Sequence, residues 1–294
     1  ATVSPSGDVN EPNGYSAYPG NSNQIILALD SYVDTLEFSK GIVSEFVNPK
    51  YTDETRTAFK KPTRLECMMQ DYPLILKQQK QGKSLNIGVT VFEDQKYETT
   101  LTHRLYAPCK NNLVDAAKKA EKGVPDASAV STELAIYALN SCLLRSFGVQ
   151  IGDPVQCEYG GIKQTEWAHI VLKPSFGTTV STIRSRFLNP SLVSITSGST
   201  LVLDGDIRIT KLSLDGALVV KAAKGCTVYL DDVTIENEGW SFTPLSSEGA
   251  GENCDIEERY LIRGYTLEKK SEGHLLEFKT EGIHRVVHNS KSPM

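Results

Sequence analysis

Cysteine and histidine are sparse in this 294-residue sequence, and neither is spaced for a metal site. The six cysteines form no Cys-x-x-Cys pair and no zinc-type pattern, so we expect reduced thiols in place of disulfides or a zinc centre. Among the five histidines, His284 and His288 lie four residues apart and can share one face of a helix, but no third ligand accompanies them. We expect both at the surface and predict no metal ligands within the chain.

Long apolar runs and familiar catalytic signatures are absent as well. No apolar stretch reaches the roughly 18 residues of a membrane span, and the first residues are polar, unlike a signal peptide. There is no P-loop and no Gly-x-Ser-x-Gly elbow, and Gly249-Ala-Gly251 lacks the strand and helix of a dinucleotide-binding turn. A net charge of -5 disfavours broad binding to nucleic acid or membrane but permits a local phosphate pocket. We expect a soluble, cytoplasmic protein.

The first part of the chain mixes helical and strand patterns. Hydrophobic residues make up 39% of the sequence, enough for buried cores in two domains. The elements expected from apolar spacing, caps and turn residues are a helix from Gln24 to Gly41 with a core-facing stripe, a short strand and helical turn over Arg64–Asp71 with Met68 and Met69 buried, a strand over Leu85–Val91, helices over Leu113–Lys122 and Ser131–Phe147, and a hairpin turning at Gly160-Gly161.

Beyond about residue 190 the pattern changes to short paired apolar positions. They recur every five to ten residues between Gly, Asp, Ser and Thr: Val193/Ile195, Leu201/Leu203, Ile207/Ile209, Leu212/Leu214, Leu218/Val220, Val228/Leu230 and Val233/Ile235. Short strands with tight corners at that period predict a β-helix, in which each coil buries its apolar face against the next. A compact sandwich is the alternative. A run of Pro174, Ser175 and Gly177 marks the expected boundary before this region.

Two stretches combine cations with hydrogen-bonding groups. Arg64 and Glu66 are two residues apart, so they lie on the same face of the expected strand. Lys110 stands just before an expected helix N-terminus, where backbone amides also favour an anion. Cations hold phosphate, whereas carboxylates and amides hold hydroxyls. From the residues alone, solvated loops are the favoured explanation of these runs.

Several runs resemble the UDP-sugar pyrophosphorylases, relatives of the UDP-glucose and UDP-N-acetylglucosamine pyrophosphorylases. The runs that carry the resemblance are Gly14-Tyr-Ser-Ala-Tyr-Pro-Gly20-Asn21-Ser-Asn-Gln24, Glu45–Tyr51, Phe59–Pro73, Tyr106–Asn112 and Leu214-Asp-Gly216-Ala-Leu218. The resemblance covers nearly the whole chain, in order. It implies an α/β fold: residues 1–178 as the C-terminal portion of a Rossmann-like nucleotidyltransferase catalytic domain, then residues 179–294 as an all-β left-handed β-helix domain.

The resemblance also implies a reaction and its residues. The enzyme would be a uridylyltransferase that makes UDP-sugars and pyrophosphate from UTP and a range of sugar 1-phosphates. Gly20, Asn21 and Glu66 would bind the sugar; Arg64 and Lys110 would bind phosphate, with Lys110 as the catalytic residue. Mg2+ is expected, bound with residues outside this chain. Met68 and Gln70 stand where an N-acetylglucosamine enzyme would place bulky aromatic residues, which favours unmodified hexoses, pentoses and uronates.

One absence qualifies this assignment. The Gly-rich basic loop that cradles UTP in such enzymes is missing, and the chain starts at Ala1 without methionine. We therefore expect the C-terminal half of an enzyme that is a monomer when intact, with its N-terminal half as partner and with the fragment inactive alone. The alternative is a non-catalytic β-helix module for stability or association. A hexapeptide-repeat acyltransferase is disfavoured because no histidine lies among the paired apolar positions to act as a base.

Overall fold

The computed structural model describes most of the chain, in two compact units. The residues described are 12, 24–47, 49–53, 55–81, 83–89, 109–123, 125–245, 257–270 and 274–291. The first unit is Ala1–Val91 and the second is Phe92–Met294, and each is treated by itself. The domain boundary expected at residue 178 stays a prediction.

The described part of the first unit contains two helices, a 3-10 turn and a small antiparallel hairpin. Their bounds are α1 (Leu29–Ser39), β1 (Glu45–Val47), β2 (Leu65–Cys67), η1 (Met69–Asp71) and α2 (Tyr72–Lys80). The expected helix thus begins five residues later than Gln24, and it ends where Lys40 takes a left-handed φ of 54° before Gly41. The strand followed by a helical turn is confirmed. Residues 85–89, the described part of another expected strand, form no strand.

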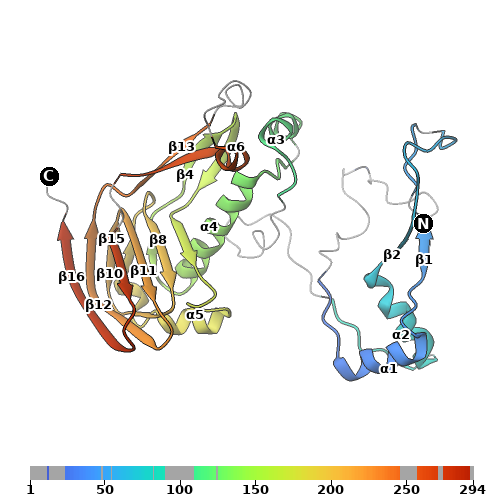
Figure 1. Ribbon diagram of the computed structural model, residues 1–294, viewed down its shortest axis with the longest axis horizontal. Coiled ribbons are helices and arrows are strands. Elements are labelled where there is room, and N and C mark those ends of the chain that lie inside the picture. Colours follow the sequence, from blue (N-terminus) through green and yellow to red (C-terminus); the bar gives the residue numbers. More distant parts are fainter. Residues whose placement is uncertain are drawn as a thin grey trace. The chain divides into compact units, whose positions relative to one another are not determined.

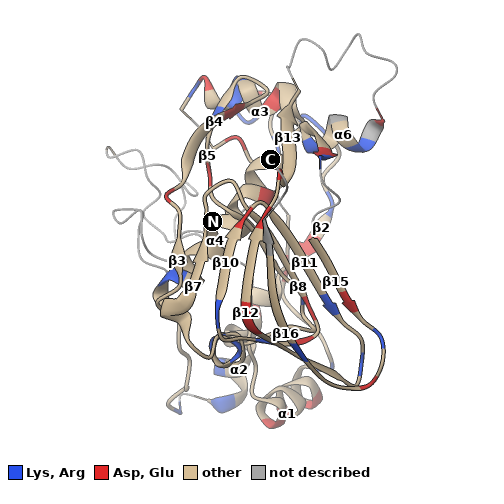
Figure 2. Ribbon diagram, turned by 90° about the vertical axis from the view of Figure 1, so that its left-hand side faces the viewer, with Lys and Arg blue, Asp and Glu red and all other residues tan. Residues whose placement is uncertain are grey.

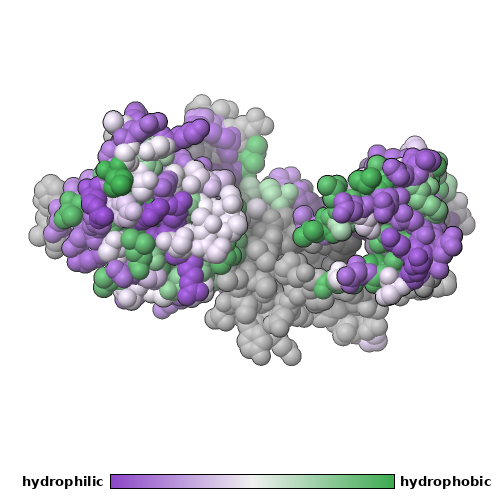
Figure 3. Space-filling model, turned by 90° about the horizontal axis from the view of Figure 1, so that it is seen from below, coloured by the Kyte–Doolittle hydropathy of each residue, from purple (hydrophilic) through white to green (hydrophobic). Residues whose placement is uncertain are grey.

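Little of the first unit's apolar surface is buried. Only Thr35 and Ile75 fall in its buried class among the described residues. The stripe expected to face a core is largely exposed, with Ile26 at 99% and Leu29 at 73%. Met68 and Met69, expected to be buried, are exposed too. Figure 3 shows hydrophobic patches lying between hydrophilic ones on this unit. Exposure of this extent is typical of a surface that another part of a protein covers.

The described part of the second unit carries four helices, a 3-10 turn and most of the strands; Figure 1 shows their arrangement. Its elements among the described residues are α3 (Leu113–Ala120), α4 (Ala129–Ser146), β3 (Gln150–Ile151), β4 (Val155–Tyr159), β5 (Ile162–Glu166), β6 (His169–Leu172), α5 (Val180–Arg186), η3 (Pro190–Leu192), β7 (Val193–Ile195), β8 (Thr200–Asp204), β9 (Asp206–Ile209), β10 (Leu212–Asp215), β11 (Ala217–Ala222), β12 (Cys226–Glu236), β13 (Trp240–Pro244), α6 (Glu258–Arg263), β14 (Tyr265–Lys269), β15 (His274–Phe278) and β16 (Gly282–Lys291).

Local signals explain where several of these elements begin and turn. The long helix α4 begins at Ala129, two residues before the expected Ser131, because Ser128 is its N-cap and Ser131 completes a reciprocal capping box. The β4–β5 hairpin turns at Gly160 and Gly161, whose φ angles of 58° and 79° suit a two-residue turn. That expected hairpin is confirmed.

Two parallel sheets hold the core of the second unit, and we call them the parallel stack. One has the strand order β16-β12-β10-β7-β3, with β9 also beside β12, and the other has the order β15-β11-β8-β6. The chain visits them in successive coils: β8, β9 and β10 form one, β11 and β12 the next, and β15 and β16 the last. Apolar side chains align from coil to coil, as Leu201 does with Leu218. Figure 2 shows charges gathered toward the strand ends.

Helix α4 packs against β3, β5 and β6 at the start of the stack (Figure 1). Asn140 Nδ2 donates to the Ile170 carbonyl at 2.8 Å, which anchors the helix to β6. The architecture is therefore mixed α/β with parallel sheets, as expected. Within the described residues, no helix is long and apolar enough to cross a membrane.

Candidate functional site

In the first unit, Arg64 and Glu66 lie together on the β1–β2 hairpin. Glu66 pairs with Phe46 in the hairpin register, and Arg64 Nε lies 3.3 Å from Glu66 Oε1. Arg64 directly precedes β2, and its side chain lies beside that of Glu66, as alternation along the chain predicts. They are 86% and 36% exposed, so the ion pair adds under about 1 kcal/mol to stability. Both groups are accessible to a ligand that carries hydroxyls and phosphate.

In the second unit, Lys110 directly precedes the capped start of α3. The backbone amides of Lys110 and Asn111 donate to the Ala127 carbonyl at 2.8 and 3.0 Å, and this fixes the loop. The Lys110 side chain is exposed and forms no ion pair with a described carboxylate. Asp115 in the first turn of α3 offsets the positive helix end, so the ammonium group provides most of the local attraction for an anion.

The remaining predicted site residues, Gly20 and Asn21, lie outside the described residues. Arg64 and Glu66 belong to one unit and Lys110 to the other. Of the predicted site residues, the structure therefore brings only Arg64 and Glu66 together among those it describes. Lys110 belongs to the other unit.

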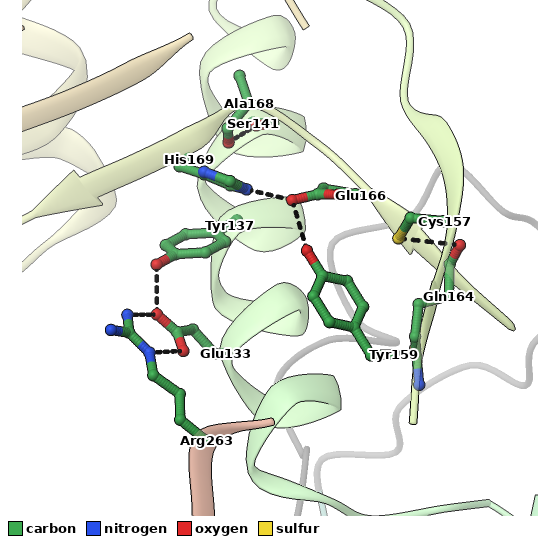
Figure 4. A network of polar contacts seen from close by, with 10 residues as sticks. All are labelled: Glu133, Tyr137, Ser141, Cys157, Tyr159, Gln164, Glu166, Ala168, His169 and Arg263. Carbon is green, nitrogen blue, oxygen red and sulfur yellow. Dashed lines mark hydrogen bonds and ion pairs between the residues drawn. The ribbon is translucent and has the colours of Figure 1, made fainter. Parts of the chain in front are cut away.

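A buried polar network in the second unit has no counterpart in the sequence predictions (Figure 4). Arg263 donates from Nε to Glu133 Oε2 at 2.9 Å and from Nη2 to Glu133 Oε1 at 2.5 Å, which joins α6 to α4. The Tyr137 hydroxyl also donates to Glu133, at 2.5 Å. Burial favours the protonated form of Glu133, but the bonds from Arg263 and Tyr137 outweigh it and hold its pKa below the ordinary value.

The second half of the network surrounds His169 at the start of β6. Its Nε2 lies 2.6 Å from Glu166 Oε1, which also accepts from the Tyr159 hydroxyl at 3.1 Å. Burial opposes the charge on Glu166, yet the bonds from His169 and Tyr159 keep its pKa below the ordinary value. Burial and the nearby Glu166 raise the pKa of the Cys157 thiol to about 12. That thiol stays protonated at neutral pH, so it is no nucleophile.

This network fastens elements together. Glu133 ties α6 to α4, and Glu166 ties the β4–β5 hairpin to β6 (Figure 4). Phe242 of β13 packs edge-on against His169, with the two ring centres 3.9 Å apart. No sequence signal points to it, since Glu133 and Arg263 are 130 residues apart. The arrangement therefore fits a structural role.

We expect Glu166→Gln to destabilise the second unit by about 1 to 3 kcal/mol near neutral pH. The folded-state pKa of Glu166 is depressed, so its carboxylate contributes stability above the ordinary value of 4.5, and that contribution is lost as pH falls through the folded value. The deficit of the variant should thus shrink in acid. Denaturant unfolding at about pH 7 and about pH 4 measures this, with exposed Glu158→Gln as control. An equal deficit at both pH values would contradict the assignment.

A hollow of about 360 Å³ lies over α6 and β14. Arg259, Tyr260, Arg263, Leu267 and Lys269 line it. Each of its cations already has a partner: Arg259 pairs with Glu257, Arg263 with Glu133, and Lys269 lies 4.5 Å from the Trp240 ring centre. The hollow therefore offers no unpaired cation to a ligand.

Metal ligation is not evident in the part of the chain that the structure describes. No three His, Cys, Asp or Glu side chains gather there to hold an ion. The expected Mg2+ site, assigned to residues outside this chain, stays a prediction.

Comparison with known proteins gives close relatives. No family model matches the chain. It is 42% identical over 270 residues to a UDP-sugar pyrophosphorylase of Oryza sativa subsp. indica and 43% identical over 270 residues to that of subsp. japonica. It is 40% identical over 266 residues to the UDP-sugar pyrophosphorylase of Arabidopsis thaliana. These matches include 90 to 92% of the chain, which spans 40% of the length of each relative, in its C-terminal part.

Proposed function

Because the chain is homologous to the C-terminal part of UDP-sugar pyrophosphorylases, we propose that it serves uridylyl transfer between UTP and sugar 1-phosphates within a longer polypeptide. The observation that carries this proposal is identity of 40 to 43% over nine-tenths of the chain. The exposed Arg64–Glu66 pair and the exposed Lys110 agree with it, because both are available to a sugar phosphate.

The proposed reaction is a direct displacement at phosphorus. An oxygen of the sugar 1-phosphate attacks the α-phosphorus of UTP, a new phosphorus–oxygen bond forms, and pyrophosphate leaves with the electrons of the broken bond. Lys110 and Arg64 hold phosphate oxygens as negative charge shifts, while Glu66, Asn21 and Gly20 orient the sugar. Positioning and electrostatic stabilisation supply the rate, with no covalent enzyme intermediate.

The other components are proposed to lie outside this chain. Mg2+ would be held there. The exposed apolar side chains at the start of α1 and just before it, such as Leu29 and Ile26, favour an N-terminal half of the same enzyme as the partner that covers them. The fragment alone would then be inactive, and the intact enzyme a cytoplasmic monomer.

We also propose that the strands of the parallel stack from β7 onward belong to a left-handed β-helix spanning residues 179–294. Successive coils pair in parallel register, with Leu201 beside Leu218 and Leu212 beside Val233. Such stacking is how a solenoid buries its core. A crystal structure in which the coils turn right-handed would overturn the handedness.

Glu66→Gln in the complete polypeptide should raise the KM for the sugar 1-phosphate about tenfold to a hundredfold, because the variant loses a charged hydrogen bond to the sugar. The KM for UTP should stay unchanged, because Glu66 is assigned to sugar hydroxyls. Pyrophosphate release with glucose, galactose, xylose and glucuronate 1-phosphates measures both values. Glu45→Gln, on the neighbouring strand β1, is the matched control. A parallel rise in both KM values would reject the sugar-binding role.

The alternative is a non-catalytic module. The second unit has its own apolar core, which favours independent folding. The mass of the native polypeptide distinguishes the two: a chain about twice this length supports the enzyme, and one of 294 residues supports the module.

A further inference from the structure

The last coil of the parallel stack places histidines at positions that earlier coils fill with aliphatic side chains. In the strand registers, His274 follows Leu218, His284 follows Val228 and His288 follows Val233. The residues of the earlier coils in these three columns are Ile170, Leu201 and Leu218; Ile207 and Val228; and Val193, Leu212 and Val233. All eight have no exposed surface.

These positions correct the expectation that His284 and His288 share a surface helix face. Residues four apart also share one side of a strand, and both lie on β16. Val286 between them packs against the core of the stack, as do Leu276 and Phe278 on β15. The three histidines therefore face the interior of the last coil. They lie after Ile235, where the paired apolar positions recognised in the sequence end.

Two of these rings lie against each other. The His274 and His288 ring centres are 4.3 Å apart at an interplanar angle of 34°. His288 Nε2 is buried and has no hydrogen-bond partner among the described residues. The third ring is held differently, since His284 Nε2 lies 2.7 Å from the Thr280 carbonyl. Protonating both members of the stacked pair would place two like charges a few ångströms apart, partly out of water.

No carboxylate occupies an inward position of the neighbouring strands β11 and β12, where it could compensate such charge. The inward positions of the neighbouring strands β11 and β12 are aliphatic, and Cys226 is the one other ionisable inward residue there. Three carboxylates of these strands form outward ion pairs: Asp231 with Arg285, Asp232 with Lys211, and Glu277 with Lys279. Lys221 of β11 lies opposite Glu277 in the strand register. Glu236, the last residue of β12, is exposed.

We propose that β15 and β16 form a proton-sensitive cap: the last coil closes the stack near neutral pH and detaches in mild acid. Detachment uncovers the edges of β11 and β12, whose backbone groups are then free to pair with another strand.

The titration of His274 agrees with this direction. Burial, and then the neighbouring His288, lower its pKa from the ordinary 6.5. A histidine whose pKa is lowered on folding binds protons more readily when its surroundings open. The closed coil is thus favoured above about pH 6.5 and loses that advantage as pH falls through the folded-state value.

Hydrogen exchange of the full chain tests the cap. Protection factors, corrected for intrinsic exchange, are compared at about pH 7.5 and about pH 5.5, on either side of the histidine pKa. We expect β15 and β16 to lose protection in acid by about tenfold for each unit by which folding depresses the pKa, while β8 keeps its protection. Equal losses in β8 and β16, or none in either, would overturn the proposal.

A variant separates the histidine pair from other acid effects. His274→Leu with His288→Val installs the aliphatic residues of the preceding coil and should remove the pH dependence. Asn289→Gln, an exposed change in the same strand, should retain it. Should the double variant fail to fold, NMR titration of the wild-type His274 imidazole decides: a depressed pKa supports the cap, and an ordinary value refutes it.

Discussion

Lys110→Ala in the complete polypeptide should lower kcat/KM by about thirtyfold to a thousandfold, which corresponds to about 2 to 4 kcal/mol of transition-state stabilisation. The side chain is exposed, has no described carboxylate partner, and stands on a loop fixed by two hydrogen bonds to Ala127. Its charge is therefore free to act on a phosphate oxygen, and its position is constrained. Rates of pyrophosphate release at varied UTP and sugar 1-phosphate measure the loss.

Lys118→Ala provides the matched control for this experiment. Lys118 is an exposed lysine in the last turn of α3, the helix that Lys110 precedes. Its removal changes the net charge equally but should leave kcat/KM near the wild-type value. Lys110→Arg should retain part of the activity, because the charge stays. An unchanged kcat/KM for Lys110→Ala would reject the catalytic role.

Gly216→Ala should destabilise the second unit by about 3 to 5 kcal/mol, the sum of backbone strain and overpacking. Gly216 forms the corner between β10 and β11 at a φ of +123°, which L residues rarely adopt. An added Cβ would lie 2.5 Å from the Asn237 carbonyl oxygen and closer still to its side chain. The Asn237 side chain accepts a hydrogen bond from the Ala217 amide at 2.8 Å and donates one to the Ala217 carbonyl at 2.9 Å. The clash would therefore disrupt two hydrogen bonds that join neighbouring coils.

Gly198→Ala is the control for the corner. An added Cβ at Gly198 meets no atom within 4 Å, and its φ lies outside the strained region. Thermal or denaturant unfolding should therefore place Gly198→Ala near the wild type and Gly216→Ala far below it. Equal stabilities would mean that the corner is less constrained than its geometry indicates.

Local patterns predicted the elements of the second unit well. The hairpin at Gly160-Gly161, the start of α3 and the paired apolar positions of the stack each follow from a few neighbouring residues. Ambiguity arose where two structures share one spacing: His284 and His288 suit a helix face and a strand face equally. Apolar spacing also cannot say whether a partner is present, so the exposed stripe of α1 was expected to be core.

Site prediction followed the same limits. Alternation along a strand was enough to place Arg64 beside Glu66. Glu133 and Arg263 meet only because α6 packs on α4, and nothing within a window of sequence encodes that approach. Long-range polar contacts of this kind depend on tertiary packing.

A crystal structure of the complete polypeptide with bound UDP-glucose tests the central claim most directly. The account predicts Lys110 Nζ at hydrogen-bond distance from a phosphate oxygen and the Glu66 carboxylate at that distance from a sugar hydroxyl. A nucleotide sugar bound with neither residue in contact would contradict it.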